Sequence, residues 1–304
     1  MRFCLVAFSA LTVLSSAGAI AADNSSPPLD SVTVEAQRQH ATLVKQVDSF
    51  VEGAMVHYSD QSLARWNKPV CPLVAGLPRD QGEFMLALLS RIAADAGIKL
   101  GAEKCTANLF VIVTREPELL LKKWRGRDAR LFDDRNGLVA IRRFLNTARP
   151  IRVWYNTGRR DLNFESVAGG IGNLNKLNIN SASNPGANSR MTLGDNDLYS
   201  ISSVIIVVDS TRVKNLTFGQ FADYLGMIGF AQLRPDSDIG SAPSILHLFA
   251  KSQAPPPALS SWDKALLKSL YATSPGDSMQ LLKINRSVLE SIQTPGAANA
   301  ASPY

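Results

Sequence analysis

The ten residues Ser200–Asp209 (SISSVIIVVD) carry the strongest strand pattern in the chain, because β-branched apolar residues fill every position from Val204 to Val208. A second apolar run, Asn108–Thr114 (NLFVIVT), has the same character. Continuous runs of this kind are typical of strands that are covered on both faces. We therefore expect both segments to be buried strands.

Segments with helical periodicity alternate with these strands along the chain. The predicted helices cover residues 36–54, 81–96, 116–124, 137–148, 217–233, 262–271 and 277–292. Alternating apolar and polar residues over Ile151–Tyr155 predict a third strand. This order predicts an α/β or α+β fold, a layered sheet with helices, in a single large domain over residues 36–292.

Local signals predict where several helices begin and which face they bury. Polar residues that precede apolar helical patterns are the expected N-caps Asp80, Thr217 and either Ser260 or Ser261. The core face of the helix over 81–96 is expected to hold Phe84, Leu88, Leu89 and Ile92. Ser31–Ala36 (SVTVEA) is short and β-prone.

The first 22 residues have the pattern of a secretory signal peptide. Arg2 gives a positive start, Phe3–Leu14 is apolar apart from two hydroxyl residues, and Ala19-Ile20-Ala21 supplies an A-x-A cleavage site. The alternative interpretation is an N-terminal core helix. Residues 23–35 are then expected to be a flexible N-terminal segment, and the mature protein to lie in the periplasm or to be secreted.

The composition suits one hydrophobic core. The chain has 304 residues, of which 45% are hydrophobic and 19% charged, so it is not globally disordered. No apolar run reaches about 18 residues, which predicts no transmembrane segment in the mature chain.

The stretch over 156–196 is rich in Gly, Asn and Ser and predicts a long functional or mobile loop. Residues 293–304 are expected to be a disordered tail.

Two cysteines remain after removal of the signal peptide, Cys71 and Cys105. An even pair in an exported chain predicts one disulfide. The alternative is two separate buried thiols. The helical pattern between the two cysteines has the length of a crossover between neighbouring parallel strands, so the bond would tie a β-α-β unit together.

Basic and aromatic residues are interleaved in the middle of the chain. The mature chain keeps 31 basic and 26 acidic side chains, a balance that permits an anionic or envelope partner without requiring one. Stacking aromatics beside positive charge suit sugars or bases, and the candidate ligand-binding residues are Trp124, Arg152, Trp154, Tyr155, Arg159 and Arg160. The alternative is an exposed basic helix face with core aromatics. No specific nucleic-acid motif is present.

Several chemistries lack their motifs. The chain contains neither the G-x-S-x-G of α/β-hydrolases nor a phosphate-binding P-loop. His40, His57 and His247 are too far apart in sequence for H-E-x-x-H, so no metal site and no cofactor are predicted. His247 is expected to be a hydrogen-bonded, partly buried histidine. A pair of carboxylates for glycoside hydrolysis stays open, because sequence spacing does not fix their separation in space.

Several segments together carry a resemblance to a family of uncharacterised proteobacterial secreted proteins. These segments are Arg65–Trp66, Val70–Pro72, Gly76–Leu77, Val204–Asp209, Leu216–Leu225, Ser244–Leu246 and Leu259–Tyr271. The resemblance spans residues 31–292. It implies that the protein is exported, and it does not indicate which activity the protein has.

The C-terminal third is also similar to secreted metzincin-like proteins, whose first helix in this region would carry H-E-x-x-H. Here that helix contains Phe221–Leu225 (FADYL) and no histidine. The similarity therefore implies a peptidase-like scaffold without zinc ligands. We expect an exported extracytoplasmic protein with a noncatalytic binding or envelope-associated role; the alternative is a hydrolase of unrecognised type that acts on envelope polymers.

Overall fold

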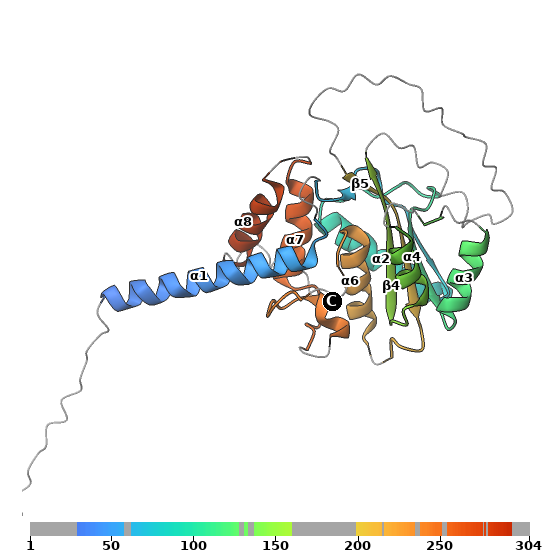
Figure 1. Cartoon of the computed structure of the whole chain (residues 1–304), viewed down its shortest axis with the longest axis horizontal. Helices are drawn as coiled ribbons and strands as arrows, with labels where there is room; N and C mark the ends of the chain where they lie inside the picture. The colour runs from blue at the N-terminus through green and yellow to red at the C-terminus, as the bar shows by residue number, and fades with distance from the viewer. Residues whose placement is uncertain are drawn as a thin grey trace, which may run out of the picture. The chain divides into compact units, whose positions relative to one another are not determined.

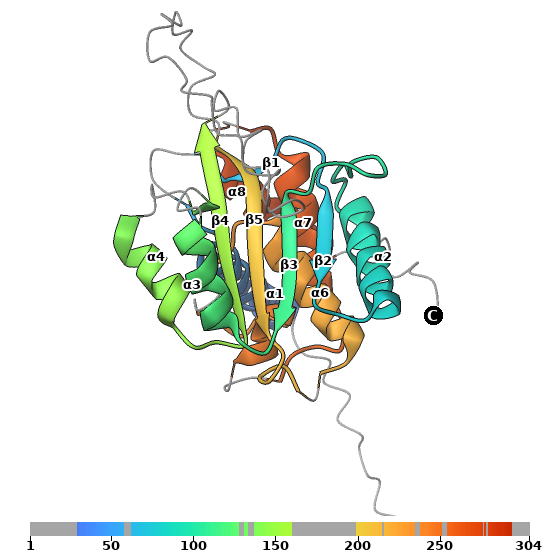
Figure 2. The same cartoon turned by 90° about the vertical axis from the view of Figure 1, so that its right-hand side faces the viewer.

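The strand β5 (Tyr199–Asp209) is the centre of a five-stranded sheet (Figure 2). The antiparallel strand β4 (Ile151–Arg159) pairs along one edge of β5. The parallel strands β1 (Arg65–Trp66) and β3 (Leu109–Thr114) share the other edge, β1 at the start of β5 and β3 towards its end. The strand β2 (Pro72–Ala75) lies parallel to β3 on its outer side.

The structure is a computed structural model, which describes residues 29–57, 62–127, 131–132, 137–159, 199–214, 216–234, 238–250, 254–275, 277 and 279–293. Its helices are α1 (Leu29–Ala54), α2 (Arg79–Asp95), α3 (Pro117–Arg127), α4 (Gly137–Asn146), α6 (Phe218–Phe230), the 3₁₀ helix η3 (Ile245–Phe249), α7 (Ser261–Ala272) and α8 (Gln280–Gln293). Figure 1 shows α7 and α8 side by side.

Helices cover both faces of the sheet because β5 is apolar on both. Val204, Ile206 and Val208 point into the larger core with α2, α6, α7, α8 and the C-terminal part of α1. Ile205 and Val207 point into a smaller core with α3 and α4. All five side chains are fully buried. A mainly parallel sheet between two helical layers is an α/β fold in a single domain, which confirms the predicted fold class and the two predicted buried strands.

Two predicted N-caps are confirmed. Thr217 and Ser260 each accept a hydrogen bond from the third residue of the helix, in reciprocal capping boxes with Gln220 and Asp263. The predicted cap at Asp80 is wrong. The residue before α2 is Pro78, and Asp80 lies in the first turn, where its negative charge still faces the positive end of the helix dipole.

The predicted core face of α2 is correct except at Phe84. The buried residues of this helix are Met85, Leu88, Leu89, Ile92 and Ala93, whereas Phe84 is 52% exposed. The Phe84 ring instead contacts the Phe218 ring from α6, with 5.9 Å between their centres. Helical periodicity identifies the apolar face of the helix, but it does not show which residues of that face lie at its buried centre and which lie at its exposed edge.

The helix α1 begins at Leu29, so Ser31–Ala36 is helical and not the β-prone segment that we expected. The helical start also falls inside the predicted flexible segment over 23–35. Extending an existing helix adds a hydrogen bond for each residue that it fixes, whereas β-branched residues lower helix stability by only a few tenths of a kcal/mol. The downstream helix therefore decides the conformation of this run.

The strand β4 continues four residues further than predicted, to Arg159, so residues 156–159 do not belong to a loop. A register shift between Asn156 and Thr157 lets both halves of β4 pair with β5. The Asn156 side chain is buried and donates to the Leu131 carbonyl oxygen and to Ser203 Oγ. The rest of the predicted loop, the predicted signal peptide over 1–22 and residues 294–304 of the predicted tail lie outside the described residues.

Cys71 and Cys105 form the predicted disulfide, with a Cα–Cα distance of 6.0 Å. The bond ties the amino ends of β2 and β3, which pair in parallel through the crossover helix α2. This confirms the predicted β-α-β unit. None of the described helices is long and apolar enough to cross a membrane.

Gly76 provides a test of how β2 leaves the sheet. Its φ is +84°, and a Cβ atom there would lie 1.8 Å from the Val113 carbonyl oxygen. We expect Gly76→Ala to lower the free energy of unfolding by more than about 2 kcal/mol, because it adds both a clash and a left-handed alanine. Urea denaturation measures the change.

Gly82→Ala is the matched control, because Gly82 lies inside α2 and a Cβ atom there would meet nothing within 4 Å. This substitution should raise the free energy of unfolding by about 0.5–1 kcal/mol. Equal effects of the two substitutions would contradict the described path of the chain after β2.

Candidate functional site

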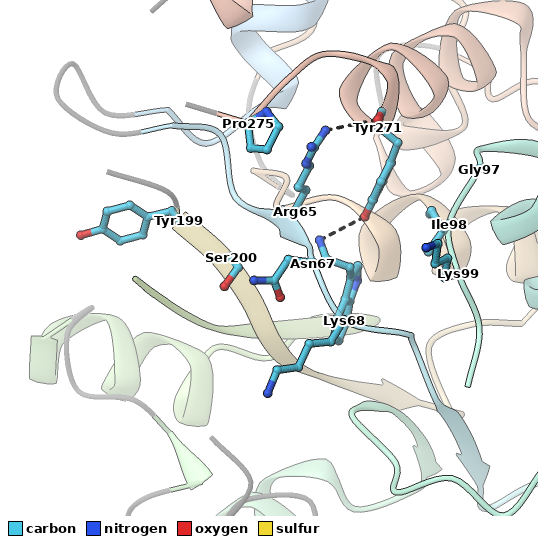
Figure 3. A pocket seen from close by; sticks show the side chains of 11 residues that line it. Arg65, Asn67, Lys68, Gly97, Ile98, Lys99, Tyr199, Ser200, Tyr271 and Pro275 are labelled. Carbon is cyan, nitrogen blue, oxygen red and sulfur yellow. Dashed lines mark hydrogen bonds between the residues drawn. The ribbon is translucent and has the colours of Figure 1, made fainter. Parts of the chain in front are cut away.

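A cavity of about 280 Å³ lies at the amino edge of the sheet, beside the start of β5 (Figure 3). We call it the amino-edge pocket. Its lining residues come from β1 and the turn after it, the turn after α2, the start of β5 and the end of α7: Arg65, Trp66, Asn67, Lys68, Gly97, Ile98, Lys99, Tyr199, Ser200, Tyr271 and Pro275. Three of these side chains are basic and none is acidic.

Backbone hydrogen bonds join two walls of this pocket. The Val70 N–H donates to the Lys99 carbonyl oxygen, and the Gly101 N–H donates to the Val70 carbonyl oxygen, both at 2.8 Å. The disulfide also joins these two segments, through Cys71 next to Val70 and through Cys105 beyond Gly101. Gly101 makes this approach feasible, because a Cβ atom there would lie 2.6 Å from Cys105 Sγ.

Arg65 lies in the wall of the pocket that β1 and the end of α7 form, and its guanidinium is already hydrogen-bonded within the protein. Its guanidinium donates to the carbonyl oxygens of Leu270, Tyr271 and Thr273 at 2.6–3.2 Å. These carbonyls lie at the C-terminal end of α7, where positive charge complements the helix dipole. Partial burial lowers the pKa of Arg65, although the nearby Tyr271 opposes this shift.

Tyr271 joins three elements behind the pocket. Its hydroxyl donates to the Phe230 carbonyl oxygen at 2.6 Å and accepts from the Trp66 N–H at 3.3 Å. Burial raises the pKa of this phenol well above its usual range, so it stays protonated and neutral. The Trp66 indole N–H donates to the Gly229 carbonyl oxygen, which fixes β1 against α6. These groups form the rigid back of the pocket.

Lys68, Lys99 and Asn67 are three polar side chains of the lining that remain for a ligand. All three are exposed, and none has a hydrogen bond or an ion pair with another described residue. The two ammonium groups therefore give the pocket positive charge that no described carboxylate neutralises. An anionic group is the ligand chemistry that this arrangement favours.

Trp124 and Trp154, two of the predicted ligand-binding residues, lie in the smaller core. They are 7% and 4% exposed, and both Phe132 and Phe144 pack against the Trp154 ring. The Trp154 indole N–H donates a hydrogen bond to Asn156 Oδ1. Both rings pack in the core against the sheet, which agrees with the alternative interpretation of core aromatics. At this exposure neither ring offers a face on which a ligand could stack.

Tyr155 points to the opposite face of the sheet from Trp154, because neighbouring strand residues alternate. Its hydroxyl donates to the Ile228 carbonyl oxygen, and burial raises its pKa far above the usual range. Arg152 is buried at 3% exposure, where it pairs with Glu118 and donates to the Leu145 carbonyl oxygen. Trp154 and Tyr155 therefore lie on opposite faces of the sheet, and the Arg152 guanidinium is held by contacts within the fold.

The side chain of Arg159 and the whole of Arg160 lie outside what the structure describes, so the last two predicted ligand-binding residues keep the status of a prediction. Among the predicted histidines, His247 is buried and hydrogen-bonded through Nε2 to the Ala242 carbonyl oxygen, as expected. No group of three or more His, Cys, Asp or Glu side chains in the described part of the chain could hold a metal ion.

The buried carboxylates of Asp263 and Asp223 accept hydrogen bonds that connect neighbouring elements of the fold. Asp263 accepts hydrogen bonds from Ser244 Oγ, from the Ile245 N–H and from the N–H and Oγ of Ser260; burial raises its pKa although these donors lower it. Asp223 accepts from the Leu259 N–H, and burial raises its pKa too. Neither residue lines the amino-edge pocket. The segments that carry the family resemblance therefore contain residues that lock α6, η3 and α7 together.

Sequence reasoning did not identify the amino-edge pocket. Arg65 lies in a segment that carried the family resemblance, but Lys68 and Lys99 have no motif or spacing that separates them from other exposed lysines. Their relation depends on the Val70–Leu100 bridge, which joins the turn after β1 to the turn after α2. Only the three-dimensional fold places these residues around one cavity.

Comparison with known proteins gives no match: no family model, no curated protein and no solved structure is significantly similar to this chain. The geometry of the chain itself is therefore the basis for the functional argument below.

The disulfide beside the pocket gives a direct stability test. We expect Cys71→Ser, Cys105→Ser and the double substitution to lower the free energy of unfolding equally, by roughly 3.5–4 kcal/mol for a loop of this length, because each removes the same cross-link. Denaturant titration of oxidised protein measures this loss. A double variant that is markedly less stable than either single one, or two titratable thiols in unreduced wild-type protein, would contradict the bond.

Proposed function

We propose that this chain is an exported extracytoplasmic protein with a noncatalytic role, and that its amino-edge pocket binds an anionic group of an envelope component. The observation that carries the proposal is the lining of the pocket, where Lys68 and Lys99 meet no described counterion and where no acidic residue contributes.

Export is supported by two independent features. The first is the signal-peptide pattern over residues 1–22. The second is the cross-link between Cys71 and Cys105, since disulfides persist in oxidising compartments such as the periplasm. The resemblance to secreted proteobacterial proteins agrees with both. The periplasm or the medium is the compartment that we propose.

The charge of the pocket favours a phosphate or carboxylate group. Two unit charges 4 Å apart attract by about 1 kcal/mol in water and by about 4 kcal/mol in a half-enclosed protein site. Lys68 and Lys99 act as point charges, while the amide of Asn67 adds a neutral donor. Phosphorylated or acidic polymers of the cell envelope carry such groups.

The alternative, a hydrolase that acts on envelope polymers, needs an acid and a base that face a substrate. The buried carboxylates Asp209, Asp223 and Asp263 accept internal hydrogen bonds and do not line the amino-edge pocket. The helix α6, which corresponds to the metal-binding helix of metzincin-like proteins in the stated similarity, is buried over Phe221–Phe230 and carries no histidine. A binding role is the function that this geometry supports best.

Export has a direct test. We expect the mature chain to begin after Ala21 or Ala22, because the A-x-A sequence ends there. Intact-mass spectrometry of the periplasmic and secreted fractions identifies the first residue. A chain in those fractions that still begins at Met1 would contradict processing by this route.

Anion binding has a charge-matched test. The double substitution Lys68→Gln with Lys99→Gln should weaken binding of inorganic pyrophosphate at least about tenfold, because it removes both positive charges that lack a described partner. Isothermal titration calorimetry at low salt measures the dissociation constant.

The control is Lys122→Gln with Lys123→Gln, which removes the same charge from the exposed face of α3, inside the basic region that the sequence singled out. This pair should leave pyrophosphate binding within about twofold of wild type. Equal weakening by the two double variants would show that only net charge matters, and absence of binding to the wild-type protein would equally contradict the proposed pocket.

A further inference from the structure

The two helices that cover the smaller core carry the same sequence pattern. Residues 119–126 of α3 read LLLKKWRG, and residues 139–146 of α4 read VAIRRFLN. In both segments three apolar residues come first, and two basic residues and one aromatic residue follow them. Figure 2 shows α3 and α4 beside each other on one side of the sheet, and the two helices are in contact. Neighbouring helices therefore repeat one arrangement of side chains.

The helical period divides this pattern between two faces. The third and sixth positions are buried in the smaller core: Leu121 and Trp124 in α3, and Ile141 and Phe144 in α4. The first, fourth and fifth positions have the spacing i, i+3 and i+4, so they share the opposite face of each helix. We call these six exposed residues the outer helix face: Leu119, Lys122, Lys123, Val139, Arg142 and Arg143.

The outer helix face is positively charged. Its two lysines and two arginines have no hydrogen bond or ion pair with another described residue. Glu118 is the one acidic residue in the sequences of α3 and α4, and it pairs with Arg152. Residues 117–149 contain nine basic and four acidic side chains, an excess of five positive charges that equals the excess of residues 23–304. The net charge of the protein is therefore concentrated in the segment that forms this face.

Large apolar side chains are exposed on the same face. Val139 is 72% exposed and Leu119 is 45% exposed, and Leu138, which precedes Val139, is 57% exposed. Exposed apolar residues beside lysine and arginine are typical of helices that lie at a membrane interface, where the apolar groups enter the boundary of the acyl chains. The basic groups then bind the phosphates of anionic lipids. A nucleic acid offers phosphates too, but its backbone offers no apolar region to Leu119 and Val139.

We infer that the outer helix face is a docking surface for an anionic lipid membrane, to which α3 and α4 attach the protein peripherally. An extended anionic surface meets all four basic side chains at once, whereas a small anion meets only one or two of them. The inference therefore agrees with the weak effect on pyrophosphate binding that we expect of the Lys122 and Lys123 substitutions. It does not rest on the amino-edge pocket, which shares no residue with this face.

Vesicle cosedimentation tests the inference. Residues 23–304 are used, because the apolar run in the predicted signal peptide would itself bind lipid. Vesicles of equal parts phosphatidylglycerol and phosphatidylcholine should bind this protein at low salt. Vesicles of phosphatidylcholine alone should bind it at least about tenfold more weakly, and added salt should weaken the binding to the anionic vesicles.

Charge variants locate the contact. Lys122→Gln with Lys123→Gln should weaken binding to the anionic vesicles at least about tenfold, because it removes two charges from the face. The matched control is Lys264→Gln with Lys268→Gln, which removes the same charge from the exposed side of α7, on the other face of the sheet. This control should bind within about twofold of wild type. Circular dichroism checks that the variants remain folded.

Two further variants test the second helix and the apolar contribution. Arg142→Gln with Arg143→Gln should weaken vesicle binding about as much as the α3 pair does, since α4 repeats the pattern. Leu119→Gln with Val139→Gln keeps every charge and should still weaken binding at least about threefold, because it removes the apolar groups that enter the membrane.

No binding to the anionic vesicles, equal binding to both kinds of vesicle, or equal weakening by the α3 pair and the α7 pair would overturn the inference. Full affinity of the Leu119 and Val139 variant, or tighter binding of duplex DNA than of the anionic vesicles, would assign the face to a polyanion and overturn it as well. Lys68→Gln with Lys99→Gln should keep vesicle binding, so a failure of the amino-edge pocket and a failure of this inference are separate results.

Discussion

The burial of both faces of β5 is the constraint on which the rest of the structure depends. Val204–Val208 are apolar in both directions and fully buried, so the strand is stable only when helices cover it from above and below. The covering layers differ in size, with α3 and α4 on one face and the larger group that contains α6 and α7 on the other. On one side of the sheet, the parallel strands β2 and β3 need a crossover connection, which α2 supplies.

This arrangement leads to the proposed function through the start of β5. The strand β1 pairs there, and Arg65 extends from it to the carbonyl oxygens at the end of α7. The Cys71–Cys105 bond and the adjacent backbone hydrogen bonds hold the turn after α2 against the turn after β1. The Arg65 guanidinium is therefore hydrogen-bonded within the protein, whereas the ammonium groups of Lys68 and Lys99 remain available to a ligand.

The sequence predicted the features that depend on local patterns. The two buried strands follow from apolar runs, the caps Thr217 and Ser260 from helix chemistry, and the disulfide from cysteine arithmetic. The candidate ligand site was not predictable in this way. Trp124 and Trp154 form part of the smaller core, since the alternation of β4 and the face of α3 direct them inward. Lys68 and Lys99 line the same pocket because two turns far apart in sequence pair with each other, and no local sequence pattern predicts this pairing.

The measurement that tests the central claim most directly is an amide ¹H–¹⁵N NMR titration of the oxidised protein, residues 23–304, with pyrophosphate. The account predicts saturable shifts for the amides of Asn67, Lys68, Lys99 and Ser200, which surround the amino-edge pocket. Shifts confined to the basic face of α3 at Lys122 and Lys123, or small non-saturating shifts over the whole surface, would contradict it.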